Sequence, residues 1–169
     1  SGFNDFSFRD NGGNDYLDVR DQKPVSSQEH RAVLMWAKED FLNGAAAQRV
    51  YFEAGSSLSV SLLVWESLAP GRWVVSDGGQ LYVSQPTFSG AGDHTVDPTS
   101  SLWAPYDPAG PYELDFDQAA ASFAAHDFQD IQAVGILLER DSYSSERLRY
   151  RLDGFSADAS WAATTGAVT

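Results

Sequence analysis

The chain has 169 residues, of which 43% are hydrophobic, enough for the core of a single domain. Its 24 acidic residues outnumber its 11 Lys and Arg residues, and the resulting net charge of −13 would repel nucleic acid and anionic membranes, so neither is an expected partner. The chain contains no cysteine, which excludes disulfides, thiolate metal sites and cysteine nucleophiles. No apolar run approaches the roughly 20 residues that are needed to span a bilayer.

The first third of the chain predicts short strands separated by turns. Residues 5–8 alternate as a strand does, and the Asn-, Asp- and Gly-rich residues 10–15 predict a loop. Residues 32–37 form a short apolar run that favours a buried strand, and Asn43-Gly44 then marks a turn. In residues 57–62 every second residue is apolar, which is the period of a strand with one buried face.

The middle of the chain predicts a hairpin, a long loop and a short helix. Residues 72–76 and 80–84 flank Asp77-Gly78-Gly79, whose glycines suit a tight turn between antiparallel strands. Residues 85–111 hold five prolines and predict an extended loop that is interrupted only at 101–104. Residues 119–126 have the best helical propensity in the chain and predict one or two helical turns.

The end of the chain predicts two further strands and a tail. Residues 131–139 form an apolar central strand, residues 148–155 alternate apolar with charged side chains, and the two are expected to pair as a hairpin closed by 141–145. The Ala- and Thr-rich residues 161–169 predict a linker-like tail after a domain of residues 1–160. Many short strands and almost no helix predict an all-β fold, a two-sheet antiparallel β-sandwich of the jelly-roll kind with at most one short helix.

Residues 128–136 and 148–157 resemble the last two strands of galactose-binding-like jelly rolls, the carbohydrate-binding modules found beside bacterial polysaccharide-degrading enzymes. In that group the penultimate strand has an Ala/Val-Gly-Ile run and the last ends in Asp and a hydrophobic residue, whereas here Gly154 separates Asp153 from Phe155. The resemblance implies a secreted module without catalytic activity. Its expected partners are a polysaccharide or oligosaccharide and a covalently linked catalytic domain.

The same resemblance implies a structural calcium ion at one edge of the sandwich, held between the first and last strands. The matching oxygen donors here would be Asp153 on the last strand and an acidic residue near the start, with Asp5 as the first choice. Calcium takes six to eight oxygen ligands, and carboxylates from separate segments supply part of such a set. Residues 10–15 lack the downstream spacing of an EF-hand and are read as an ordinary turn.

Sugar binding requires flat aromatic faces and a few polar groups. The large rings that could supply such faces are Trp36, Trp65, Trp73, Tyr82, Trp103 and Tyr106. Trp36 lies in an apolar run and is expected in the core. For Trp65, burial in the core and service as a sugar-binding platform, meaning an exposed ring on which a sugar stacks, are weighted equally.

Trp103 and Tyr106 lie in the Pro-rich segment, where no sheet requires them, and are therefore the predicted platforms. Trp73 and Tyr82 would form a cross-strand pair with or without a ligand. Arg72 would donate hydrogen bonds to sugar hydroxyls, although a solvated charge is the ordinary state of such a residue.

No catalytic motif emerges from the sequence. The histidines, His30, His94 and His126, have no metal-ligand spacing, and no Gly-x-Ser-x-Gly motif accompanies them. Asp93-His94 in its Gly-rich stretch is interpreted as containing a solvent-exposed loop histidine, with an acid–base pair as the less favoured alternative. Residues 113–117 predict a strand whose carboxylates lie on the solvent-exposed face. The first hypothesis is a glycan-binding module, the second a structural or adhesion domain, and the third a small jelly-roll lyase or hydrolase.

Overall fold

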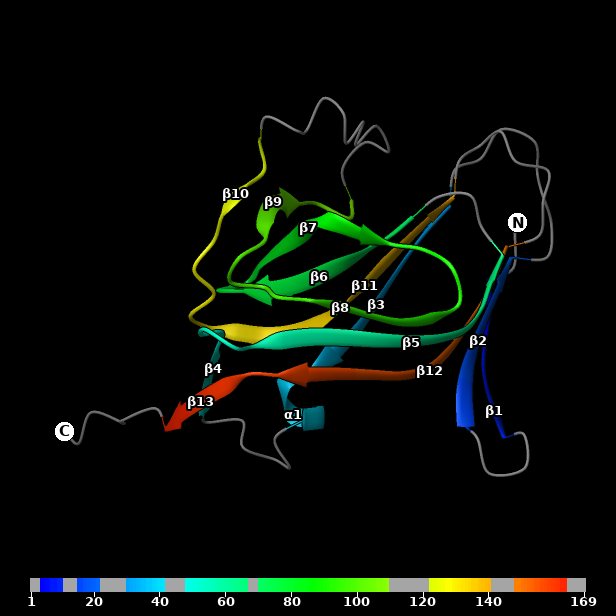
Figure 1. Ribbon diagram of the computed structural model, residues 1–169, viewed down its shortest axis with the longest axis horizontal. Coiled ribbons are helices and arrows are strands. Elements are labelled where there is room, and N and C mark those ends of the chain that lie inside the picture. Colours follow the sequence, from blue (N-terminus) through cyan, green and yellow to red (C-terminus); the bar gives the residue numbers. More distant parts are fainter. Residues whose placement is uncertain are drawn as a thin grey trace.

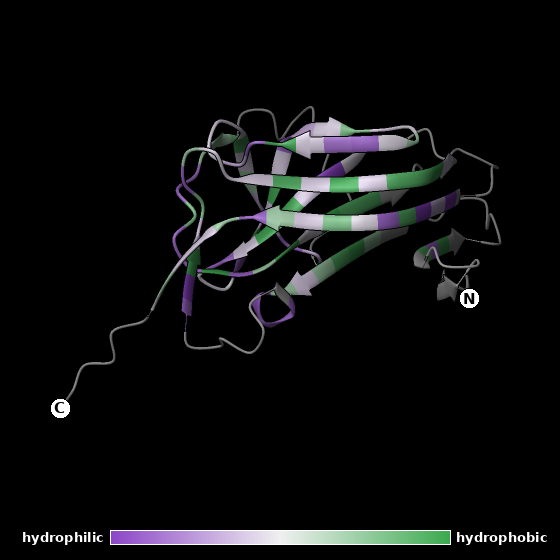
Figure 2. Ribbon diagram, turned by 60° about the horizontal axis from the view of Figure 1, so that its bottom comes forward, coloured by the Kyte–Doolittle hydropathy of each residue, from purple (hydrophilic) through white to green (hydrophobic). Residues whose placement is uncertain are grey.

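The computed structural model describes residues 4–10, 15–21, 30–41, 48–66, 70–109, 122–140 and 148–163. Within these ranges antiparallel strands pack in two layers, and the helix α1 (Lys38–Phe41) is short and hydrophilic (Figures 1 and 2). The predicted all-β, two-sheet sandwich is therefore confirmed. None of the helical residues described here is part of a helix that is long and apolar enough to cross a membrane.

The two layers are a five-stranded and a six-stranded sheet, called sheet A and sheet B. Sheet A has the order β1 (Asn4–Asp10), β2 (Asp15–Asp21), β12 (Leu148–Asp158), β5 (Ser57–Glu66), β8 (Gly92–Val96). Sheet B has the order β10 (Ala124–Ala125), β9 (Leu102–Tyr106), β7 (Gln80–Phe88), β6 (Gly71–Asp77), β11 (Ile131–Arg140), β3 (His30–Ala37). A two-stranded ribbon of β4 (Gln48–Tyr51) and β13 (Ser160–Ala163), the end ribbon, lies where β11 begins and β12 ends (Figure 1).

The main core lies between the two sheets and follows from the period of two along each strand. In β5, Leu58, Val60 and Leu62 are all at most 2% exposed, whereas Leu63 on the other face is 44% exposed. Figure 2 shows this alternation as green segments between white and purple ones along the strands. Burying each of these aliphatic side chains stabilises the fold by about 1.5–3 kcal/mol, so the alternating pattern fixes which face of β5 turns inward.

Sheet B is also apolar on its outer face. Val74, Val83 and Leu137 are fully buried there, together with Ala104 and Tyr106, in a cluster separate from the main core. A strand that is buried on both faces reads as a continuous apolar run rather than an alternating one. This explains why β6 and β11 carry unbroken apolar stretches.

The hairpin predicted around Asp77-Gly78-Gly79 is confirmed. β6 and β7 pair antiparallel, with Asp77 opposite Gln80 in register. Gly78 and Gly79 have φ values of +56° and +85°. A two-residue turn with two positive φ angles matches the twist of the flanking strands and favours glycine at both positions.

The long loop predicted over residues 85–111 is wrong where β7 continues to Phe88 and where β8 forms, whereas the predicted interruption at 101–104 overlaps β9. The prolines do not prevent pairing. Pro86 lies beyond the last residue of β7 that pairs with β9, and Pro105 lies beyond the part of β9 that pairs with β10. Each proline therefore lacks a paired residue on at least one side, although Pro105 still lies in register with Tyr82 of β7.

The helix predicted over residues 119–126 is also wrong where it is described. Ala124 and Ala125 form β10 and pair with Trp103 and Leu102 of β9, while residues 119–121 lie outside the described residues. Tertiary pairing here outweighs the helical propensity of a short alanine run.

The expected terminal hairpin is wrong as well. β11 lies between β6 and β3 in sheet B, and β12 lies between β2 and β5 in sheet A. β11 is apolar on both faces and therefore suits sheet B, which is buried on both faces. β12 alternates apolar and polar residues and therefore suits sheet A, which has one buried face.

Other predicted segments also lie wholly or partly outside the described residues. They are the turn at 43–44, the strand at 113–117, the closing loop at 141–145 and most of the loop at 10–15. The predicted tail of 161–169 differs at its start, because residues 161–163 belong to β13 and pair with β4.

Candidate functional site

The two predicted sugar platforms are buried. Trp103 and Tyr106 are each 2% exposed, so the prediction that these rings face water is wrong. Trp103 packs edge-on against Phe128 with ring centroids 5.0 Å apart, and its Nε1–H donates to the carbonyl of Pro98 at 2.9 Å. Both rings lie on β9, whose pairing into sheet B turns one toward the main core and the other toward the outer cluster.

Two of the remaining predicted rings are explained by packing. Trp73 is 1% exposed in the main core. Trp65 is half-buried and packs edge-on against Phe88 and Tyr150, with centroids 5.7 Å and 4.7 Å away. The predicted cross-strand pair of Trp73 and Tyr82 does not form, since the register places Tyr82 opposite Val75.

Arg72 ties β6 to the end of β7. Its Nη1 donates to the carbonyl oxygens of Ser84 and Gln85 at 2.7 Å and 2.8 Å, and its guanidinium stands 5.7 Å from the ring centre of Phe123. These contacts use the side chain for the fold, so its predicted role in sugar binding receives no support from its position.

Asp5 and Asp153 do not come together. β1 and β12 are separated by β2, and Asp5 lies in register with Arg20, which lies in register with Arg149. Two strand spacings of about 4.8 Å and four residues of about 3.3 Å separate the two backbones by roughly 16 Å. Calcium ligands lie about 2.3–2.6 Å from the ion, so one ion cannot be bound by both Asp5 and Asp153, and a structural calcium ion stays a prediction. The described residues contain no group of three or more acidic or histidine side chains arranged to hold a metal.

An open pocket of about 260 Å³ lies at the end of the sandwich, beside the end ribbon. We call it the end pocket. Its walls come from β3, α1, β4, β11, β12 and β13. The residues that line it are Trp36, Lys38, Val50, Phe52, Ile131, Ala133, Val134, Ala157, Asp158, Ala159 and Trp161.

The floor of the end pocket is formed where β3 ends beside β11. Trp36 pairs in register with Val134, so both side chains point from the same face of sheet B. One face of the Trp36 ring is covered by Phe155 of sheet A, in a parallel stack with centroids 4.4 Å apart. The chain then turns into α1, where the carboxylate of Asp40 accepts the Ala37 N–H at 2.9 Å. Lys38 is thereby placed at the pocket.

The end ribbon is fastened to the sandwich from several directions. The Phe52 N–H donates to the Phe128 carbonyl at 3.2 Å, and Lys38 Nζ donates to the Gln48 carbonyl at 3.4 Å. The hydroxyl of Ser160 donates to the Glu53 carboxylate. Because Val50 and Trp161 are opposite each other in the ladder, both side chains lie on the pocket face of the ribbon.

The end pocket contains an exposed aromatic ring, Trp161. It is 56% exposed, and the other large hydrophobic side chains exposed in the described part of the chain, Leu63 and Leu102, are aliphatic. A single exposed apolar residue is ordinary on a protein surface. The indole lines the same pocket as the cation of Lys38 and the carboxylate of Asp158, which makes the end pocket the candidate binding site in the described part of the chain.

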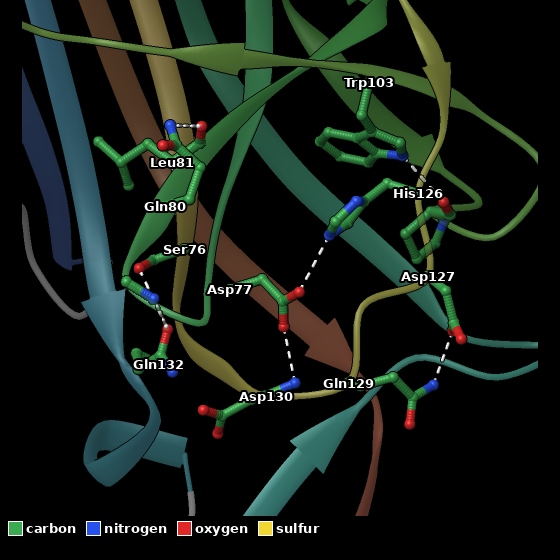
Figure 3. Close-up of polar contacts among 12 residues, drawn as sticks. Ser76, Asp77, Gln80, Leu81, Trp103, His126, Asp127, Gln129, Asp130 and Gln132 are labelled. Atoms are coloured by element: carbon green, nitrogen blue, oxygen red, sulfur yellow. Dashed lines mark hydrogen bonds and ion pairs between the residues drawn. The ribbon is translucent and has the colours of Figure 1, made fainter.

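A second polar cluster surrounds Asp77 at the β6–β7 turn (Figure 3). The Asp77 carboxylate accepts the Asp130 N–H at 2.6 Å and the His126 Nε2–H at 3.0 Å. His126 also stacks on Tyr82, with centroids 4.0 Å apart. Both carboxylate oxygens hold the segment 126–130 against the turn, so this Asp–His pair has a structural role.

His94 likewise makes a structural contact. The predicted exposed loop around Asp93-His94 is the strand β8. His94 Nε2 lies 3.0 Å from the Gly90 carbonyl, which accepts its proton in the matching tautomer. This hydrogen bond connects β8 to the bend at Gly90 that precedes it.

Sequence reasoning missed Trp161, and for Trp36 it favoured the core over a binding surface. The local sequence around Trp161 is Ser-Trp-Ala-Ala, which has no strand alternation, and its pairing partner β4 lies far away along the chain. What the arrangement offers chemically is binding: an aromatic face, an apolar floor, one donor and one acceptor. Searches of family models, curated proteins and solved structures produced no match to this chain.

Proposed function

We propose that this domain is a non-catalytic glycan-binding module whose ligand site is the end pocket. The observation that carries the proposal is the exposed Trp161 ring at the rim of that pocket. The C–H face of a pyranose ring stacks on an indole, and burying one large aromatic face removes much apolar surface from water. Trp161 thus takes the platform role that the sequence had suggested for Trp103 and Tyr106.

The polar groups of the end pocket suit a neutral sugar. Lys38 can donate to a hydroxyl oxygen and Asp158 can accept a hydroxyl proton, and neighbouring sugar hydroxyls satisfy both needs. A uronic acid would bring its carboxylate toward Asp158 and toward a chain with a net charge of −13. In a longer protein, such a module would hold a linked catalytic domain near its polysaccharide and raise the effective concentration there.

A structural or adhesion domain is the second candidate. It is favoured by the burial of Trp103 and Tyr106, the two rings that the glycan hypothesis had assigned to the surface. In that case the end ribbon only covers the end of the sandwich, and Trp161 is an ordinary exposed residue.

Affinity electrophoresis separates these two functions. The panel consists of soluble starch, xyloglucan, galactomannan and arabinoxylan, each intact and after partial acid hydrolysis. We expect the wild-type domain to be retarded by at least one of them and Trp161→Ala to weaken that binding about fivefold or more, since an aromatic contact is worth about 1 kcal/mol in addition to the apolar area that it buries.

The matched control is Leu63→Ala, which removes another exposed apolar side chain from the far face of β5. Both variants should unfold at the wild-type urea concentration, because surface substitutions change stability by about 0.5 kcal/mol or less. If no glycan of the panel retards the domain, or if wild type and Trp161→Ala are retarded equally, the structural or adhesion function would explain the domain better than glycan binding.

A further inference from the structure

We infer that the end pocket receives the terminal ring of a glycan chain and does not bind along the interior of a chain. This inference rests on the proposed function and concerns the mode of binding at the same site. It depends on the size of the pocket, on the way its walls are fixed and on the distribution of exposed aromatic rings.

The size of the end pocket suits one sugar ring. Its volume is about 260 Å³, just below the range of about 300–1,000 Å³ for small-molecule sites. A site of this size suits one ring better than two.

The walls leave little room for a chain to pass through. On the inner side, Trp36 of sheet B stacks on Phe155 of sheet A and closes the space between the two layers. On the outer side, the bond from Phe52 to Phe128 and the bond from Lys38 to Gln48 hold the end ribbon against the sandwich. A ring in the interior of a chain has a neighbour on both sides. Walls that are fixed on two sides of an otherwise open pocket favour a ring with only one neighbour, which would leave through the open side.

The exposed surface of the described residues offers no row of platforms. Binding along a chain uses several aromatic faces spaced along a groove, whereas Trp161 is the one aromatic residue among the exposed large hydrophobics of the described part. A terminal ring also carries one hydroxyl that an interior ring uses in its glycosidic bond. Lys38 can donate a hydrogen bond to the oxygen of that additional hydroxyl, and Asp158 can accept its proton.

The test counts binding sites per mass of glycan. The glycans are unbranched soluble chains, namely amylose, pullulan, mixed-linkage β-glucan and debranched xylan, so that terminal rings occur only at chain ends. Each is titrated into the domain by calorimetry, intact and after partial acid hydrolysis has shortened the chains tenfold. Terminal binding predicts that the sites per gram rise about tenfold with the number of chain ends, while the Kd per site stays constant. Trp161→Ala should lose binding to both forms, and Leu63→Ala should retain it.

Two results would overturn the inference in distinguishable ways. If the sites per gram stay constant on hydrolysis while Trp161→Ala still loses binding, the pocket binds chain interiors and the glycan-binding function stands. If no intact or hydrolysed glycan shows binding that depends on Trp161, the proposed function fails and the terminal mode fails with it.

Discussion

At the scale of single residues, burial separates two tryptophans that look alike in the sequence. Trp103 has its indole N–H bonded to a carbonyl and its ring inside the core, whereas Trp161 has more than half of its surface in water. Residue type and local polarity do not distinguish the two positions. The difference arises from which neighbouring strand each one pairs with.

Trp103→Ala should therefore destabilise the domain and not selectively remove a binding surface. Truncating a buried aromatic residue leaves a cavity and costs about 3–5 kcal/mol, so the urea midpoint should fall strongly. Trp103→Phe, which loses the N–H bond and part of the ring, should lie between Ala and wild type. A Trp103→Ala variant with an unchanged midpoint would contradict the burial of this ring.

Gly135 marks the closest approach between β11 and β3. A Cβ atom at this position would lie 1.9 Å from the Leu34 carbonyl oxygen, and backbone cannot move aside as a flexible side chain can. Gly135→Ala should cost about 3 kcal/mol, the upper part of the range for overpacking, in urea unfolding. The matched control is Gly154→Ala on β12, where a Cβ would meet nothing within 4 Å. Equal midpoints for the two variants would show that β3 is not held this close.

At the scale of elements, the turn between β8 and β9 depends on one carboxylate. Asp97 Oδ1 accepts the Thr99 hydroxyl and the Thr99 N–H, both at 2.8 Å, and the Ser100 N–H at 3.3 Å. The hydrogen bond from the Thr99 hydroxyl is the largest cause that lowers the pKa of Asp97 below its usual value of 3.8, and the backbone bond from Thr99 is the next. This turn is an Asx turn, which favours Asp at its first position.

The lowered pKa fixes the sign of a pH effect. The folded chain binds fewer protons at Asp97 than the unfolded chain, so the stabilisation is complete above pH 3.8 and is lost as the pH falls through the folded value. Asp97→Ala should lower the urea midpoint at pH 7, and its difference from wild type should shrink below pH 3.8. Thr99→Val, which lacks the hydroxyl donor, should reduce the pH dependence, and a difference that grows on acidification would contradict this account.

The elements also show where local sequence is a sufficient guide. The β6–β7 hairpin was predictable because the two glycines determine the turn and the turn determines the register. The two alanines of β10 were not, because their strand conformation depends on pairing with β9 and not on their own propensity.

At the scale of the whole molecule, the net charge of −13 opposes compaction. The distance over which charges interact falls from about 30 Å at 0.01 M salt to about 8 Å at 0.15 M, so salt should relieve this repulsion. We expect Tm to rise by about 2–4 °C over this range, the effect of about 1 kcal/mol in a domain of this size. Sodium chloride and choline chloride should act alike, and a constant or falling Tm would contradict a dominant role for self-repulsion.

The sequence by itself determined the all-β class, most of the strands and the two-sheet sandwich, because alternation of apolar residues and turn-forming glycines act over a few neighbours. Only the tertiary structure decided the sheet assignment of β11 and β12, the burial of Trp103 and the position of Trp161 beside the end pocket. These features depend on contacts between segments far apart in the chain. Their free energies arise from pairing and packing, which no local pattern encodes.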